Sequence, residues 1–223
     1  PLKIVTKYVS NIECKVDRCL AKSLSHLSRD SVYGYLVHHF SDFVENPRIW
    51  NDFLRLQEAG KINKIGFSLY FPNELDLLLE KQISFDIIQI PYNLFDRRFE
   101  KYFPILKEKE VEIHVRSVFL QGLFFMRAVD LGKQFQQIKE KLEKIKMVAI
   151  ESNEDIASIA LRFVFSNPYI EKIIIGVNNF AAYRTNIRTI AEYRDLEKNL
   201  DLLSFLRVDD ERILIPSMWK RDV

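Results

Sequence analysis

Short apolar runs and longer amphipathic stretches alternate regularly along the chain. Six runs have the length and the β-branched content of buried strands: 3–7, 33–39, 64–69, 86–92, 111–120 and 172–177. They are apolar on both faces, as expected for parallel strands that helices cover on both sides.

The stretches between these runs carry apolar residues at steps of three and four, which is typical of amphipathic helices. We predict helices over 12–28, from Asn46–Pro47 to Gly60, from Pro72 onward, and over 98–109, 135–150, 155–166 and 180–193. About six strand–helix units in series predict an α/β fold with a parallel sheet. No low-complexity linker divides them, so we expect a single domain over residues 1–223.

Two parallel folds fit this order of units, an open doubly wound sheet and a (β/α)8 TIM barrel. The glycine-rich GxGxxG turn of dinucleotide-binding doubly wound sheets does not occur in the sequence. We therefore favour an incomplete TIM barrel with about six βα units, lacking about two at its N-terminus. The strand pattern begins within about three residues of Pro1, and we expect further sequence before it.

Composition and charge narrow the class of protein. Lys and Arg number 33 against 31 Asp and Glu, and these charges are interspersed, which argues against a nucleic-acid partner. No apolar run approaches the roughly 18 residues of a membrane span, and no leader pattern opens the chain. With two cysteines, Cys14 and Cys19, taken as reduced packing residues, we expect a cytoplasmic protein without a membrane partner.

Polar residues stand at the ends of two neighbouring predicted strands. The run 3–7 ends at Lys7, and the run 33–39 ends with His38 and His39. Alternation along a strand places these two histidines on opposite faces, so only one of them can serve a given site. From the pattern alone, Lys7 also fits a solvated strand end and His38 a buried core histidine, and we expect His39 to be a core histidine. A zinc site at the histidine pair would need further ligands at suitable spacing, and we expect no metal.

Six stretches in the same order resemble the aldo-keto reductase superfamily, from the first residues to about residue 190. They are VTK ending at Lys7, YLVHH with His38, GKINKIGFSLYFPNEL, IQIPYN, VRSVFLQGL and IIIGVNNFAAYRTNI. The resemblance implies a barrel that binds a nicotinamide cofactor, NADP or NAD, and reduces a small-molecule carbonyl with an Asp, Tyr, Lys and His tetrad. It assigns the last two members to Lys7 and His38.

The Asp and Tyr of the family lie before the lysine strand, so the resemblance places them outside this chain. Tyr8 points to the opposite face from Lys7, and Tyr33 and Tyr35 lie inside a strand, so none of them is a good substitute.

The resemblance also assigns cofactor-binding residues. Ser68 and Gln89 match positions that bond the nicotinamide carboxamide, with Leu69 where the family usually has Asn, and Arg116 stands where many members stack a tyrosine. Ser117 and Gly122 match the diphosphate loop, and Gly176 and Asn186 the adenosine end, with Arg184 the nearest candidate for a 2′-phosphate. Ser68, Gln89 and Ser117 could instead satisfy backbone groups at strand ends. Arg97 and Arg98 fit a solvated helix start or, less well, a substrate-anion site.

Two functions follow. The first is an NAD(P)H-dependent oxidoreductase that reduces an aldehyde, ketone or sugar, with residues 1–223 alone inactive because half the tetrad is absent. The second is a non-catalytic barrel remnant that keeps cofactor or partner contacts. The oligomeric state stays open, although a barrel short of two strands would expose two sheet edges.

Overall fold

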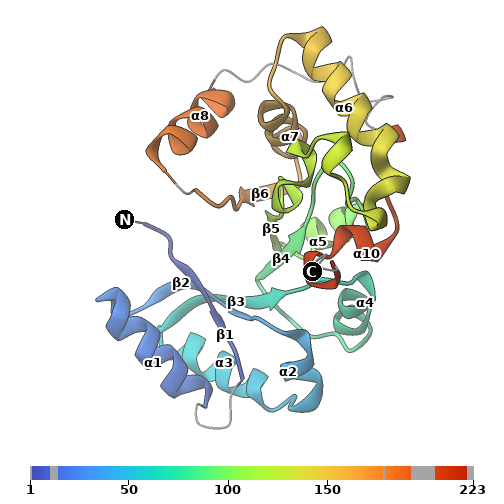
Figure 1. Cartoon of the computed structure of the whole chain (residues 1–223). Coiled ribbons are helices and arrows are strands. Elements are labelled where there is room, and N and C mark those ends of the chain that lie inside the picture. Colours follow the sequence, from blue (N-terminus) through green and yellow to red (C-terminus); the bar gives the residue numbers. More distant parts are fainter. Residues whose placement is uncertain (1, 11–14, 178, 192–203, 220–223) are drawn as a thin grey trace. The chain divides into compact units, whose positions relative to one another are not determined.

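The strand–helix alternation is present in the computed structural model, which describes residues 2–10, 15–177, 179–191 and 204–219 (Figure 1). The six strands are β1 Val5–Tyr8, β2 Val32–Val37, β3 Ile62–Ser68, β4 Ile87–Pro91, β5 Glu112–Arg116 and β6 Ile170–Ile173. They form one sheet in chain order, and β1, β2, β3 and β4 pair in parallel. Five of the predicted strands are confirmed in place, whereas β6 begins two residues before the predicted run 172–177 and ends at Ile173.

Helices follow most of the strands. The α-helices are α1 Val16–Leu27, α2 Phe40–Glu45, α3 Ile49–Glu58, α4 Pro72–Glu80, α5 Phe103–Glu108, α6 Lys139–Ser152, α7 Ile156–Phe165, α8 Phe180–Ala191 and α10 Glu211–Leu214. Short 3-10 helices are η1 Glu100–Tyr102, η2 Leu120–Phe125, η3 Ala128–Asp130, η4 Lys133–Ile138 and η6 Pro216–Met218. None of the helices in the described part of the chain is long and apolar enough to cross a membrane.

The chain divides into two compact units. The first comprises Pro1–Ile90 and Phe103–His114, and the second comprises Pro91–Tyr102 and Val115–Val223. The expected single domain over 1–223 stays a prediction, and the two units are described separately below.

The sheet of the first unit has one face packed on helices and one face that carries its polar residues. Tyr35 and Phe67 point toward α3, where Tyr35 stacks on Phe53 and Phe67 on Trp50, with ring centroids 5.0 and 4.5 Å apart. In Figure 1, α1 and α3 lie on this side of β1, β2 and β3. The register places Lys7, Leu36 and Gly66 in one row, which the pleat turns to the opposite face.

One glycine of this row is required by close packing. A Cβ atom at Gly66 would lie 1.8 Å from the carbonyl oxygen of Ile87 on the neighbouring strand β4. No side chain fits there, so β3 and β4 approach each other closely just before Ser68 and Gln89.

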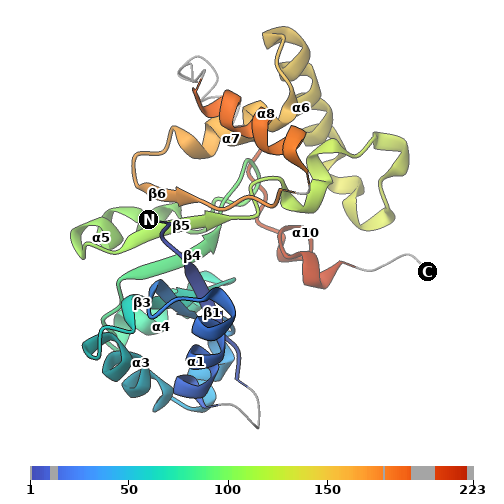
Figure 2. The same cartoon turned by 90° about the vertical axis from the view of Figure 1, so that its left-hand side faces the viewer.

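In the second unit, α8 lies along α7 (Figure 2). The hydroxyls of Ser158 on α7 and Thr189 on α8 are 3.0 Å apart and buried. The helix α7 begins as predicted, because the Asp155 carboxylate accepts a hydrogen bond from the backbone N–H of Ser158.

Several predicted boundaries are wrong. The strand expected to end at His39 ends at Val37, and α2 occupies residues for which no element was predicted. The helix expected from Asn46–Pro47 begins at Ile49, and the one expected over 98–109 is split into η1 and α5. The strand over 111–120 stops at Arg116.

The prediction for the cysteines is wrong for Cys19, which is disulfide-bonded. Cys14 lies outside the described residues.

Candidate active site

Lys7 and Ser68 are brought together from strands β1 and β3. The Lys7 ammonium donates a hydrogen bond to the Ser68 hydroxyl over 3.0 Å, although the residues are 61 positions apart in the chain. Ser68 is 1% exposed and Lys7 is half-buried. Because β2 lies between β1 and β3, the lysine side chain reaches across β2 on the polar face of the sheet. Tyr8 points the other way and packs edge-on against Phe53, as predicted.

Gln89 stands beside Ser68 in the register of β3 and β4. It is 5% exposed, and its carbonyl oxygen accepts the backbone N–H of Leu69 over 2.8 Å. Adjacent residues in register point to the same face, so the structure brings Lys7, Ser68 and Gln89 to one side of the sheet.

His38 lies immediately after β2, and its backbone N–H donates to the carbonyl of Tyr8 over 2.9 Å. The expectation that His38 and His39 point opposite ways is wrong. Their rings are stacked, with centroids 4.4 Å apart and planes at 10°, because the strand has already ended at Val37 and the alternation no longer applies. His39 is exposed and precedes α2, so it is not a core histidine.

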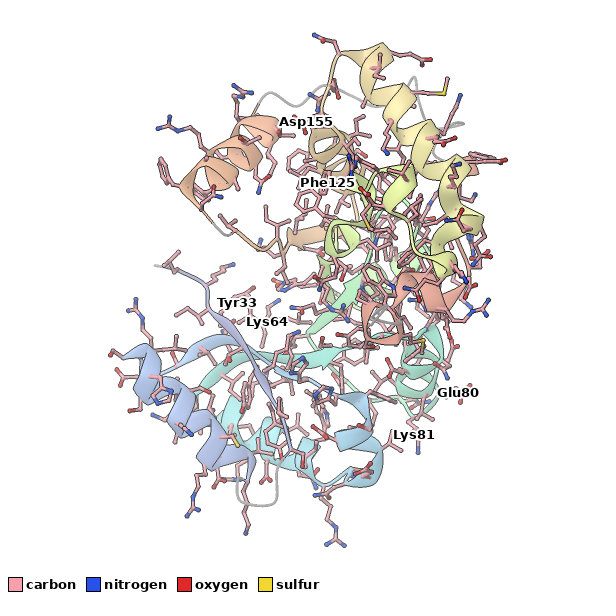
Figure 3. All side chains as sticks on the ribbon, in the orientation of Figure 1. Tyr33, Lys64, Glu80, Lys81, Phe125 and Asp155 are labelled. Carbon is pink, nitrogen blue, oxygen red and sulfur yellow. The ribbon has the colours of Figure 1, made fainter. Side chains whose placement is uncertain are left out.

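A second polar cluster lies on the amino-terminal halves of β2, β3 and β5, and sequence reasoning did not find it. The Glu112 carboxylate accepts hydrogen bonds from the Tyr33 hydroxyl at 2.5 Å and the Lys64 ammonium at 3.0 Å, and it lies 3.0 Å from Nε2 of His114. Tyr33 and Lys64 lie close together in Figure 3 because both reach the same carboxylate oxygen. The available signal was the alternation of Glu112, His114 and Arg116 along one face of β5.

The pKa values of this cluster follow from its contacts. Burial alone would raise the pKa of Glu112, but hydrogen bonds from Tyr33, Lys64 and His114 and the Lys64 charge hold it at about 2. Burial and the Glu112 carboxylate raise the pKa of Tyr33 to about 12. A tyrosine held this firmly protonated is a poor proton donor near neutral pH.

In the second unit, the predicted diphosphate-loop residues follow β5. Arg116 ends the strand and its guanidinium donates to the Ser117 hydroxyl over 3.3 Å. Gly122 has φ +87°, a conformation that favours glycine, and a Cβ there would meet nothing within 4 Å. The backbone at Gly122 is therefore open to a ligand, which fits the expected approach of a diphosphate.

The residues predicted for the adenosine end are spread over a strand end and α8. Gly176 is exposed, and Asn186 is 8% exposed on the same part of α8 as buried Thr189. Arg184 is exposed, with its guanidinium 5.2 Å from the centre of the Phe180 ring. Two residues apart on a helix, Arg184 and Asn186 point to different sides, so the structure does not bring these two side chains together.

Arg98 is not part of a solvated helix start. It is 9% exposed and forms a two-pronged ion pair with the fully buried Asp96. Arg97 pairs with Glu100 at 2.8 Å. Among the described residues, no group of three or more His, Cys, Asp or Glu side chains could hold a metal ion.

A family model described as the Aldo/keto reductase family matches residues 1–201. The chain belongs to this family. The uncharacterized oxidoreductase YqkF of Bacillus subtilis (strain 168) is 22% identical over 199 residues, which cover 84% of this chain and 64% of YqkF. The uncharacterized oxidoreductase YrpG of the same organism is 25% identical over 198 residues, covering 82% and 61%. The chain thus spans less than two thirds of either relative.

Solved aldo-keto reductases share the fold. The apo form of aldo-keto reductase AKR11C1 from Bacillus halodurans has a TM-score of 0.74 at 19% identity, covering 92% of this chain and 71% of that one. The thermostable aldo-keto reductase Tm1743 has a TM-score of 0.67 at 21% identity. The predicted fold class is confirmed: a parallel α/β fold of the aldo-keto reductase barrel type, with six strands present.

Proposed function

We propose that the protein is an NAD(P)H-dependent oxidoreductase that reduces an aldehyde, ketone or sugar carbonyl, and that residues 1–223 alone are inactive. The observation that carries the proposal is the Lys7–Ser68 hydrogen bond at the carboxyl ends of β1 and β3. It links the residue assigned to proton transfer with a residue assigned to the nicotinamide. In barrels of parallel strands, chemistry takes place at this end.

The residues present fit a nicotinamide dinucleotide. The Ser68 hydroxyl has one proton and two lone pairs, so it can accept from Lys7 and donate to a carboxamide oxygen at the same time. A charged donor polarises the hydroxyl and makes it a stronger donor in turn. Gln89, beside Ser68 in register, offers a side-chain amide for the same carboxamide, and Gly122 offers open backbone for the diphosphate.

The nicotinamide, when bound, supplies the hydride. Lys7 holds a positive charge beside the reacting carbonyl and lowers the pKa of the tyrosine that protonates it; this tyrosine is expected from residues encoded before Pro1. His38 polarises the carbonyl oxygen or relays the proton. The cofactor is NADP or NAD, and the partner is a small-molecule carbonyl. The rest of the cofactor is assigned to Arg116, Ser117, Gly176, Arg184 and Asn186.

The test is carbonyl-dependent oxidation of NADPH and NADH by the protein with all residues that its gene encodes before Pro1, over a panel of aldehydes, ketones and sugars. We expect turnover by that protein and none by residues 1–223. Absence of turnover over the whole panel would contradict the proposal.

A second candidate is a non-catalytic barrel that binds a cofactor or partner. It is favoured by Leu69, an apolar residue that stands next to Ser68 where the family usually has an Asn for the nicotinamide carboxamide. It predicts upstream sequence without the family's Asp and Tyr, and saturable nicotinamide binding without turnover.

A further inference from the structure

The loop after β5 has an unusual backbone. Within Ser117–Gly122, four residues have positive φ: Ser117 at 62°, Leu120 at 43°, Gln121 at 52° and Gly122 at 87°. Three of them carry a Cβ, which disfavours this region. Such a conformation persists where its surroundings hold it, and it is often found at ligand sites.

Asn93 holds the start of this loop. Its side-chain amide donates to the carbonyl oxygen of Ser117 over 3.0 Å, and its amide oxygen accepts the backbone N–H groups of Phe95 and Asp96, both at 2.9 Å. Asn93 is fully buried. The amide nitrogen thus joins the segment after β4 to the loop after β5, while the amide oxygen fixes the turn of its own segment.

Asp96 and Arg98 extend this connection. Both carboxylate oxygens of Asp96 accept from the Arg98 guanidinium at 2.9 Å, and the Asp96 carbonyl accepts the backbone N–H of Asn93 over 3.1 Å. Asp96 is 0% exposed. A two-pronged pair of this kind fixes direction as well as distance.

The C-terminal segment 204–219 closes the connection. Glu211 on α10 accepts from Nη1 of Arg98 over 3.0 Å, and the backbone N–H of Val208 donates to the carbonyl of Phe95 over 2.9 Å. This segment lies beyond residues 1–201, which the family model matches. An element outside the family match is therefore connected, through Arg98, Asp96 and Asn93, to a loop assigned to the cofactor.

We propose that Asn93, Asp96, Arg98 and Glu211, here called the brace, position the loop Ser117–Gly122 for a dinucleotide diphosphate, so that the C-terminal segment sets cofactor affinity. The inference rests on the proposed function. A loop already held in its binding conformation loses less entropy on binding, so a weakened brace lowers affinity. All four are positioning residues.

The test uses Glu211→Ala with Asp209→Ala as the matched control. Each variant removes one carboxylate from the same segment, but Asp209 pairs with Arg207 at the surface, where its side chain is 70% exposed. The readouts are amide hydrogen exchange and NADPH titration of the protein with all encoded upstream residues. The amides of Leu120 and Gly122 report on the loop, because they donate to Ser117 and Phe119 at 2.9 Å.

For Glu211→Ala we expect exchange in the loop and the Kd for NADPH each to rise about fivefold, while exchange in β3 is unchanged. Asp209→Ala should match the wild type, and Glu211→Gln, which keeps an acceptor for Arg98, should restore affinity to within about twofold. Asn93→Ala should also raise loop exchange and the Kd for NADPH. If Asn93→Ala does not fold, the Glu211→Ala result decides the test by itself.

Unchanged loop exchange in Glu211→Ala would overturn the inference, as would an equal rise in Asp209→Ala. If loop exchange rises in Glu211→Ala but the wild type binds neither NADPH nor NADH, the proposed function fails and the cofactor part of the inference with it, while the mechanical link between segment and loop is retained.

Discussion

Two clusters of the first unit contain a lysine and a histidine, yet their surroundings differ. At the amino-terminal halves of the strands, Lys64 and His114 both meet the Glu112 carboxylate. At the carboxyl ends, Lys7 donates to a neutral hydroxyl, that of Ser68, and His38 follows β2 half-buried. The residue types alone therefore do not identify a chemical site.

The difference lies in the acceptor. A carboxylate with three polar neighbours keeps its charge to low pH and keeps Tyr33 protonated, so the Glu112 cluster is suited to joining strands. A hydroxyl carries no charge, and it can accept from the lysine and pass a hydrogen bond onward. We therefore expect stability effects at one end and catalytic effects at the other.

The largest expected effect is on turnover. Lys7→Met should lower kcat about a thousandfold, because the positive charge beside the reacting carbonyl is lost. Lys64→Met, on the same sheet face, should leave kcat within about twofold of the wild type because it lies in the stabilising cluster. Steady-state kinetics of the protein with all encoded upstream residues would measure both, and equal losses would remove the distinction between the clusters.

Glu112→Gln should lower the free energy of unfolding by about 2 kcal/mol, because Lys64 loses its partner charge in a partly buried place. Urea unfolding measures this. Asp52→Asn, which breaks the exposed pair with Arg55, is the control and should cost less than about 0.5 kcal/mol. A cost for Glu112→Gln as small as that of the control would show that the cluster does not stabilise the sheet.

Ser68→Ala should raise the Kd for NADPH about fivefold, because one hydrogen bond to the cofactor is lost. The free energy of unfolding should change little. Ser158→Ala removes another buried hydroxyl, on α7, and should leave the Kd unchanged. Calorimetric titration distinguishes the two, and an unaltered Kd in Ser68→Ala would separate Ser68 from the cofactor.

The last expected effect is the pH dependence of the Glu112 contribution to stability. The pKa of Glu112 in the folded protein, about 2, lies below its ordinary value of 4.5. Its contribution is therefore fully present above about pH 5 and is lost as the pH falls toward 2. The stability difference between the wild type and Glu112→Gln should shrink over that range, and a difference independent of pH would contradict the assigned pKa.

The strands could be predicted because each is a local apolar run, and α4 because Pro72 and Glu74 mark its first turn, where the Glu74 carboxylate accepts the N–H of Phe71. The end of β2 could not be predicted, because His38 and His39 carry no signal that distinguishes a strand from the turn after it. The six-residue helix α2 was hidden for a similar reason, since it is shorter than two full helical periods.

The site was predictable only in part. Strand-end positions indicated Lys7 and His38, and a family resemblance gave their roles and that of Ser68, whereas the Lys7–Ser68 bond depends on the register of three strands. The Glu112 cluster joins residues 79 positions apart, from Tyr33 to Glu112. Periodicity within one segment carries no information about such pairs.

Nicotinamide binding is tested most directly by fluorescence titration with NADPH and NADH of the protein that includes all residues encoded before Pro1. We expect saturable binding of at least one of them, with affinity lowered in Ser68→Ala. No saturable binding of either nucleotide would contradict the proposed function and would leave the aldo/keto reductase fold here without its nicotinamide chemistry.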